Sequence, residues 1–197
     1  MADRELARVT EISKQVLGLH RQAAEAVEFK LTDVLDGALS FYTLQLREAF
    51  IEVRRDYRDS PLLVSAPGEM RQIFSNLIGN AIEVLPGGGM LQLRVSEYHS
   101  LTHGPSVRVT ITDNGPGISA TVRRRIFEPF FTTKGAHGTG LGLWVVRGLV
   151  RKHHGTVRVR TATQGRWRGT CFSVVFPKVD VASDPAAGDS PMLRTKE

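Results

Sequence analysis

The chain has 197 residues, which is enough for one domain of ordinary size and an appendage. Hydrophobic residues make up 41% and charged residues 23%, the balance of a globular domain, and no run approaches eighteen consecutive apolar residues, so no membrane segment is expected. The net charge of +6 comes from basic residues spread along the chain without interleaved aromatic side chains, which argues against nucleic acid as a partner.

The compartment is indicated by two features. The first residues, Met1-Ala2-Asp3-Arg4-Glu5, lack the apolar stretch of a secretory signal. The single Cys171 cannot form an internal disulfide, which fits a reducing environment. We therefore expect a cytoplasmic location.

Residues 1–24 predict a separate amphipathic helix. Leu6, Val9, Ser13, Val16 and His20 follow one another at alternating steps of three and four residues, which places them on one stripe. Such a narrow stripe packs on a partner helix, which would give a homodimer, or folds back on its own domain, and the sequence leaves both possibilities open.

Residues 25–179 predict the main domain. A helix is expected from Thr32 to Ala49 and another from Pro67 to the stop signal Pro86-Gly87-Gly88-Gly89. Strands are expected over 51–57, 62–65, 90–97, 107–113, 156–160 and 171–176, with a long loop over 114–137 and a helix over 139–153.

Alternating apolar residues in these strands indicate a sheet with one covered face. The fold class is therefore α+β, a two-layer sandwich in which helices cover one face of a mixed, mostly antiparallel sheet, preceded by the first helix. Residues 180–197 contain almost no large apolar side chain and predict a disordered tail.

The helix from Pro67 carries a polar strip beside its buried face. Asn76, Asn80 and Glu83 follow helical spacing, and amide oxygens are hard ligands suited to Mg²⁺. The alternative for Asn76 is that its amide bridges neighbouring backbone.

A carboxylate stands at the end of an expected strand. Asp113 is followed at once by Asn114-Gly115-Pro116-Gly117, a tight turn whose glycines let the backbone approach a ligand closely. Asp113, Gly115 and Gly117 are therefore candidate binding residues.

A glycine-rich segment opens the helix expected over 139–153. Backbone N–H groups at a helix N-terminus favour phosphate, and the segment does not follow a strand directly, which argues against a dinucleotide-binding turn. Lys134 in the preceding loop could reach phosphates or remain solvated. The candidate phosphate-binding residues are Gly138, Thr139, Gly140, Leu141, Gly142 and Leu143.

The loop before this segment also contains an aromatic cluster. Phe127, Phe130 and Phe131 surround Pro129. They either anchor the loop on the core or form a surface by which the loop docks on a partner helix.

The four segments Asn76–Asn80, Asp113–Ile118, Phe127–Lys134 and Gly138–Leu143 resemble, in this order, the N, G1, F and G2 boxes of sensor histidine kinases. The resemblance covers about Thr32 to Pro177 and implies the Bergerat ATP-binding fold. It implies ATP and Mg²⁺ as cofactors, with Asn80 as the metal-binding residue, Asp113 as acceptor for the adenine amine and Thr170 near adenine. Residues 1–24 resemble the second helix of the dimerisation hairpin.

The resemblance also implies a reaction and its partners. The γ-phosphoryl group of ATP would pass to a histidine on a hairpin helix, and then to a response regulator. No segment of this sequence resembles the acceptor, because His20 is followed by Arg21-Gln22. The acceptor segment is therefore expected outside this sequence.

Two other functions occur in the same superfamily. Gyrase-like ATPases place a general-base glutamate where this chain has Asn76, and an amide cannot take a proton from water, so an ATPase clamp is disfavoured. An anti-sigma-type serine kinase that sequesters a partner is the other alternative, and the aromatic cluster argues against it.

Overall fold

The computed structural model describes residues 26–102, 104–135 and 138–178. The predicted helix of residues 1–24 and the predicted tail of residues 180–197 lie outside these ranges, so both remain predictions. Within the described residues, no helix combines the length and the apolar character needed to cross a bilayer.

Five strands form the main sheet in the spatial order β2-β4-β5-β7-β6. They are β2 (Ile51–Tyr57), β4 (Gly89–Ser100), β5 (Gly104–Asp113), β6 (Thr156–Ala162) and β7 (Gly169–Pro177). β2 pairs with β4 in parallel, and the remaining neighbours pair antiparallel. A two-stranded sheet joins β1 (Val27–Lys30) to β3 (Leu62–Ser65).

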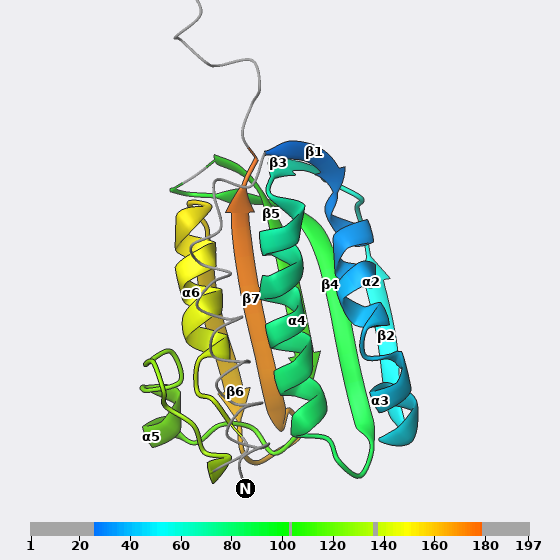
Figure 1. The fold of residues 1–197 in the computed structure, drawn as a ribbon, viewed down its shortest axis with the longest axis vertical. Coiled ribbons are helices and arrows are strands. Elements are labelled where there is room, and N and C mark those ends of the chain that lie inside the picture. Colours follow the sequence, from blue (N-terminus) through cyan, green and yellow to red (C-terminus); the bar gives the residue numbers. More distant parts are fainter. Residues whose placement is uncertain (1–25, 103, 136–137, 179–197) are drawn as a thin grey trace, which may run out of the picture.

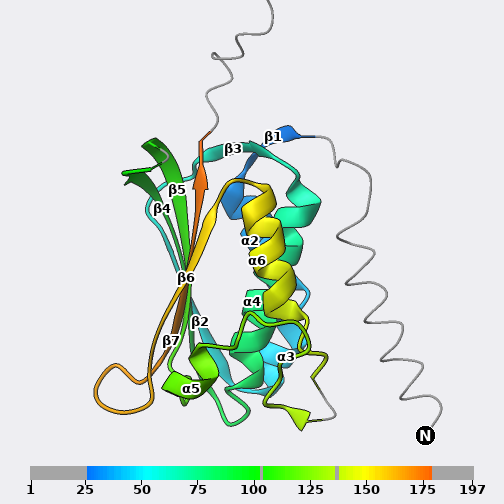
Figure 2. The same cartoon turned by 90° about the vertical axis from the view of Figure 1, so that its left-hand side faces the viewer.

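The helices lie on one face of the main sheet, as Figure 2 shows. α4 (Pro67–Glu83) runs between α2 (Leu31–Ser40) and α6 (Gly142–Lys152) in Figure 1. The short helices are α3 (Thr43–Glu48), after α2, and α5 (Ala120–Arg123), after β5. The predicted α+β sandwich, with a mixed, mostly antiparallel sheet covered on one face, is confirmed.

The core lies between these two layers. α4 buries an apolar face at helical spacing, and the strands bury every second residue against it. Pro67 stands in the first turn of α4, where its missing N–H costs no hydrogen bond. Fully buried side chains from both layers include Ile73, Phe74, Leu77, Ile78, Leu91, Leu93, Val109 and Val174.

The single helix expected over Thr32–Ala49 is wrong, because the chain forms α2 and α3 with a break between them. The Ser40 hydroxyl donates to the Gly37 carbonyl, and the Thr43 hydroxyl donates to the Ser40 carbonyl, both at 2.8 Å. Such side-chain bonds offer the backbone an alternative to the helix. Tyr42 in the break donates from its hydroxyl to the Ser75 carbonyl of α4 at 2.9 Å.

Three further boundaries differ from expectation. α6 begins at Gly142 rather than Thr139, because Gly140 adopts a left-handed conformation (φ 67°) that a helix cannot contain. The loop over 114–137 contains α5, whose N-cap Ser119 accepts from the Val122 N–H. β1 was not expected at all, since its four residues show too short a pattern to identify.

Candidate functional site

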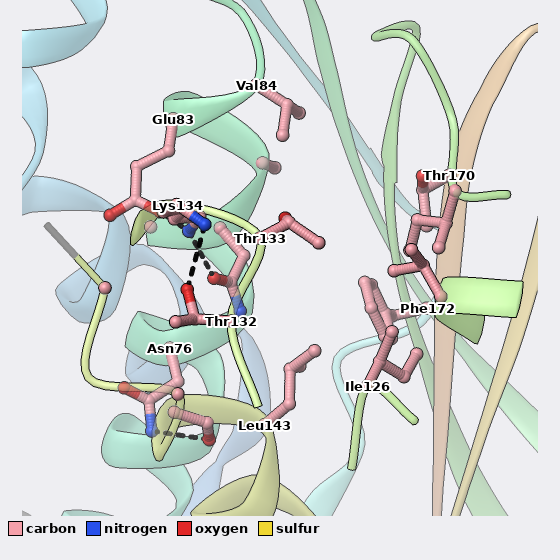
Figure 3. A pocket seen from close by; sticks show the side chains of 18 of the residues that line it. Asn76, Glu83, Val84, Ile126, Thr132, Thr133, Lys134, Leu143, Thr170 and Phe172 are labelled. Atoms are coloured by element: carbon pink, nitrogen blue, oxygen red, sulfur yellow. Dashed lines mark hydrogen bonds and ion pairs between the residues drawn. The ribbon is translucent and has the colours of Figure 1, made fainter. Parts of the chain in front are cut away.

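A cavity of about 540 Å³ opens at one end of the two layers. It lies between the C-terminal half of α4, the turn after β5, and the loop before α6 (Figure 3). Most of the predicted site residues line it, namely Asn76, Asn80, Asp113, Gly117, Lys134, Gly138, Thr139, Gly140, Gly142, Leu143 and Thr170. Gly115 and Leu141 are the predicted residues that do not.

Asp113 reaches the cavity because of the alternation in β5. It lies on the same face as Val107, Val109 and Ile111, at the end of the strand, so its side chain points to the helical layer. Only 5% of Asp113 is exposed. Its Oδ1 accepts the Gly115 N–H at 2.9 Å and the Thr170 N–H at 3.2 Å.

These contacts engage one of the two carboxylate oxygens of Asp113. Both hydrogen bonds end on Oδ1, so Oδ2 is the oxygen that remains for a donor from the cavity. Burial raises the pKa of Asp113 above its ordinary value, although the N–H groups of Gly115 and Thr170 oppose the shift. A buried carboxylate that keeps one oxygen for a ligand selects ligands that donate a hydrogen bond there.

Glycines set the close backbone approaches around Asp113. A Cβ on Gly117 would stand 2.1 Å from the Ala162 carbonyl oxygen, and one on Gly169 would stand 2.1 Å from the Asp113 carbonyl oxygen. Gly115 lies behind Asp113 rather than in the cavity wall, and its N–H orients the carboxylate. Gly115 therefore acts through Asp113.

Asn76 makes the backbone contact that the sequence left open. Its side-chain amide donates to the Gly142 carbonyl at the start of α6, at 3.3 Å, while the residue also lines the cavity. The contact joins α4 to the glycine-rich segment. An amide used in this way is no general base.

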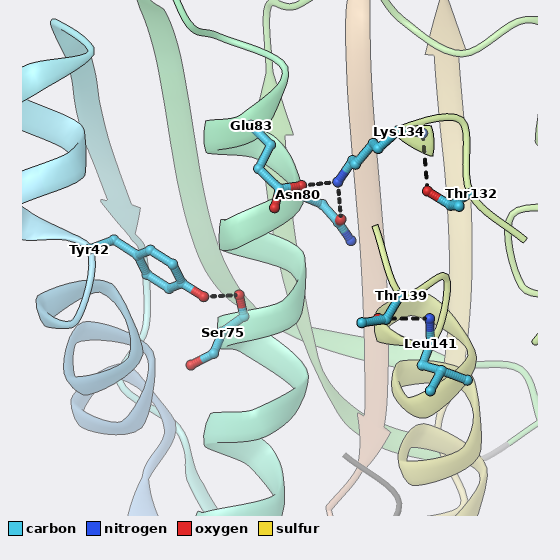
Figure 4. Close-up of polar contacts among 8 residues, drawn as sticks. All are labelled: Tyr42, Ser75, Asn80, Glu83, Thr132, Lys134, Thr139 and Leu141. Atoms are coloured by element: carbon cyan, nitrogen blue, oxygen red, sulfur yellow. Dashed lines mark hydrogen bonds and ion pairs between the residues drawn. The ribbon is translucent and has the colours of Figure 1, made fainter. Parts of the chain in front are cut away.

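Asn80, Glu83 and Lys134 meet on the other side of the cavity (Figure 4). The Lys134 ammonium donates to Asn80 Oδ1 at 3.2 Å and forms an ion pair with Glu83 Oε2. Lys134 is the one lysine or arginine in the cavity lining that the structure describes. Burial lowers the pKa of Lys134 from its ordinary value, which increases its need for an anionic partner.

The glycine-rich segment wraps against the loop that precedes it. A Cβ on Gly140 would lie 2.4 Å from the Phe130 carbonyl carbon. Leu141 is buried, with 1% exposed, and its carbonyl accepts the Val145 N–H at 2.9 Å. Leu141 therefore anchors the segment in the core instead of facing the cavity.

The aromatic cluster is divided between the core, the cavity and the surface, so anchoring is observed for Phe127 and docking on a partner helix stays a prediction. Phe127 packs against the core, and the Arg147 guanidinium lies 5.8 Å from its ring centre. Phe131 lines the cavity beneath the Arg125 guanidinium, 4.2 Å from its ring centre. Phe130 is 68% exposed. The loop is thus anchored by Phe127 and presents Phe130 outward.

Sequence reasoning missed two positioning residues. The Thr161 hydroxyl accepts the Ile118 N–H at 2.8 Å and donates to the Gly169 carbonyl at 2.9 Å, so it joins the turn after Asp113 to β7. Tyr42 lines the cavity from the break between α2 and α3. Neither residue lies in a local motif, because both act on segments distant in sequence.

A divalent metal here would need few protein ligands. Within the described residues, no three His, Cys, Asp or Glu side chains gather in a way that could hold an ion. Mg²⁺ suits such a place, since it keeps several waters and phosphate oxygens in its coordination shell. Asn80 Oδ1 already contacts a cationic group, the Lys134 ammonium, so this oxygen is accessible to a cation from the cavity.

The comparisons with known proteins agree with one another. The family model for histidine kinase-, DNA gyrase B- and HSP90-like ATPases matches residues 66–180. Sporulation kinase A of Bacillus subtilis is 34% identical over 88% of this chain and 28% of its own length. Sensor histidine kinase ZraS of Escherichia coli K12 is 33% identical over 93% of this chain and 37% of its own length.

Solved structures give the same result. The catalytic domain of histidine kinase ThkA matches with a TM-score of 0.68 at 27% identity, over 78% of this chain and 98% of its own. Full-length ShkA, solved in complex with AMPPNP, matches with a TM-score of 0.71 at 27% identity, over 86% of this chain and 35% of its own.

A helical layer on a mixed sheet, with this cavity between α4 and the segment before α6, defines a nucleotide-binding catalytic domain. The chain belongs to the histidine kinase-, DNA gyrase B- and HSP90-like ATPase family. The predicted resemblance to sensor histidine kinases is confirmed, and the relatives named above are kinases. The chain spans about a third of the length of these curated relatives.

Proposed function

We propose that this domain binds Mg²⁺ and ATP and donates the γ-phosphoryl group to a histidine on a dimerisation helix absent from this chain. The observation that carries the proposal is the position of Asp113, buried at the inner end of the cavity with Oδ2 available to a donor. The exocyclic amine of adenine is such a donor. A base without it would leave the carboxylate unsatisfied.

The opposite end of the cavity suits the phosphates. Gly138, Thr139 and Gly140 lead into α6, whose N-terminal N–H groups carry partial positive charge, and Lys134 adds a full charge. The AMPPNP complex of the related ShkA supports ATP as the nucleotide. Leu143, Gly142 and Thr170 complete the proposed nucleotide contacts from the cavity wall.

Asn80 is the residue that would hold Mg²⁺. When bound, the metal would screen the negative charge of the phosphates. Phosphoryl transfer depends mainly on positioning and charge stabilisation, so this chain needs no base of its own for the reaction. Asn76, whose amide contacts the Gly142 carbonyl, supports transfer to a histidine over efficient hydrolysis.

The proposed partners follow from the kinase relatives. They are the acceptor-histidine segment of the full-length kinase and a response regulator, with residues 1–24 as a possible site of homodimerisation. The cytoplasm is the proposed compartment, supported by the free Cys171 and by ATP as the substrate.

The experiment mixes the chain with radiolabelled ATP and Mg²⁺, alone and with a fragment that carries the acceptor histidine of a related kinase. Alone, the chain should remain unlabelled. With the fragment, an acid-labile phosphohistidine should form on the fragment. Asn80→Ala, which removes the oxygen that would bind Mg²⁺, should reduce it by about tenfold or more. Phosphoserine on an added partner would instead favour the anti-sigma-type kinase, and rapid release of inorganic phosphate would favour an ATPase clamp.

A further inference from the structure

Glu83 places a negative charge in the lining of a cavity that is proposed to bind phosphates. It lies one turn beyond Asn80 on α4 and lines the same cavity. A carboxylate there repels phosphates unless a cation neutralises it. The Lys134 ammonium does so, through the ion pair with Glu83 Oε2.

The same ammonium group also donates a hydrogen bond to the side chain of Asn80. Lys134 Nζ donates to Asn80 Oδ1 at 3.2 Å while it is paired with Glu83, so one cation joins both α4 residues to the loop (Figure 4). An amide oxygen that accepts from an ammonium group does not bind a metal at the same time. Lys134 must therefore leave Asn80 before this oxygen can serve Mg²⁺.

The ion pair between Lys134 and Glu83 is weak enough to be exchanged for another anionic partner. Its side chains are 35% and 56% exposed, and pairs of this exposure contribute little because water screens them. A triphosphate offers the ammonium several anionic oxygens in place of one carboxylate. Lys134 is followed by Gly135, around which the structure leaves open space, so the loop is not confined by packing at this point.

We propose that Glu83 is a positioning residue that holds Lys134 as a latch, tying the loop of residues 131–135 to α4 until nucleotide phosphates take over the ammonium. The exchange with phosphates rests on the proposed nucleotide site, but the tie between loop and helix does not. Glu83 thereby sets how readily the cavity opens and how readily Asn80 becomes available to the metal.

The first test needs no nucleotide. Hydrogen exchange of the backbone amides of residues 131–135 is measured in the full chain and in Glu83→Gln, Lys134→Met and the double variant. The latch predicts exchange up to about fivefold faster in each single variant, and no further increase in the double variant. Glu48→Gln is the matched control, because Glu48 is an exposed acid of the neighbouring α3 without an ion pair to Lys134, and it should exchange like wild type. Exchange in Glu83→Gln equal to that of wild type would overturn the latch.

The second test measures the affinity for ATP with Mg²⁺ by calorimetry. Glu83→Gln should bind up to about fivefold more tightly than wild type, and this gain should disappear in the Lys134→Met background. An equal gain in that background would show simple repulsion between Glu83 and phosphate and would overturn the latch. Weaker binding of Glu83→Gln, seen only with Mg²⁺, would make Glu83 a metal ligand and would also overturn it.

The two tests separate the latch from the proposed function. If the wild-type chain binds no ATP, the proposed function fails, while the hydrogen-exchange comparison still decides whether Glu83 and Lys134 tie the loop to α4. If ATP binds but exchange is unchanged in Glu83→Gln, the latch fails and the proposed function stands.

Discussion

Asp113 combines burial with a fixed orientation. Two backbone N–H groups hold Oδ1, and the helical layer shields the residue from water. The alternation of β5 and the turn that follows it were enough to predict this placement. Thr161, which joins that turn to β7, was not predictable, because no local pattern marks its contacts with Ile118 and Gly169.

The raised pKa of Asp113 gives a pH dependence to nucleotide binding. Because burial raises this pKa, Asp113 takes up a proton at a higher pH than an ordinary aspartate. The protonated carboxyl group is no longer a charged hydrogen-bond acceptor for the nucleotide. The affinity for ATP should therefore fall on acidification at a pH above the ordinary aspartate range. Fluorescent-nucleotide titrations across a pH series measure this.

Asp113→Asn provides the control for this pH effect. It should bind ATP about tenfold to a hundredfold more weakly at neutral pH, since hydrogen bonds to charged groups contribute about 1.5–3 kcal/mol. Its residual affinity should not show the same acid-dependent step. An identical step in the variant would assign the titration to another group.

Two glycines of one segment should differ in their tolerance of a methyl group. Gly140→Ala places a Cβ 2.4 Å from the Phe130 carbonyl carbon at a positive φ, whereas Gly142→Ala meets nothing nearer than Asn76, at 3.8 Å. Gly140→Ala should destabilise the protein by about 1–3 kcal/mol, and Gly142→Ala by less than about 0.5 kcal/mol. Urea unfolding of both variants measures this difference, and an equal loss of unfolding free energy in the two would contradict the loop geometry.

At the scale of elements, a buried glutamate ties α4 to α6 at the end remote from the cavity. Glu69 Oε1 accepts from Lys152 Nζ at 2.6 Å, and Oε2 lies 2.7 Å from His153 Nε2. Ser65 Oγ lies 2.9 Å from His153 Nδ1. Serine, histidine and glutamate in this order resemble the triad of a hydrolase. Ser65 is buried and so cannot meet a substrate, and the cluster instead holds α4 and α6 together.

Glu69→Gln should weaken this tie in a pH-dependent way. Burial raises the pKa of Glu69, but the hydrogen bonds and charges of Lys152 and His153 outweigh it, so the pKa is lowered overall. The stabilisation is therefore present above the ordinary glutamate pKa and is lost as the pH falls through the lowered one. Glu69→Gln should cost about 1–3 kcal/mol at neutral pH and progressively less in acid.

Urea unfolding at several pH values tests the tie. Glu52→Gln is the matched control, because Glu52 forms only an exposed ion pair with Arg54 and should change stability little. If Glu69→Gln matched this control at neutral pH, the tie between α4 and α6 would contribute nothing.

The helices and strands of the main sheet were largely predictable from periodicity, but their ends were not. Pro67 and the apolar spacing that follows it specify α4 almost completely. The break at Phe41 and Tyr42 combines local side-chain bonds of Ser40 and Thr43 with a hydrogen bond from Tyr42 to Ser75 of another helix, and the apolar periodicity does not reveal it. Likewise, the meeting of Lys134 with Asn80 and Glu83 depends on how the loop folds back over α4.

At the scale of the whole molecule, the cavity of the candidate site lies where the two layers separate at one end, between α4 and the loop before α6. Four motifs from separate parts of the chain meet there because β5, α4 and α6 all direct an end toward it (Figure 3). Their order in the sequence predicted the family, and the fold brings residues of all four motifs to one cavity.

The central claim is that this cavity binds adenine nucleotide through Asp113. Isothermal titration of the full chain with ATP and with GTP, each with Mg²⁺, tests it most directly. The account predicts one site that binds ATP at least about tenfold more tightly than GTP, because guanine presents a carbonyl where adenine presents its amine. Equal affinity for the two nucleotides, or no binding of ATP, would contradict it.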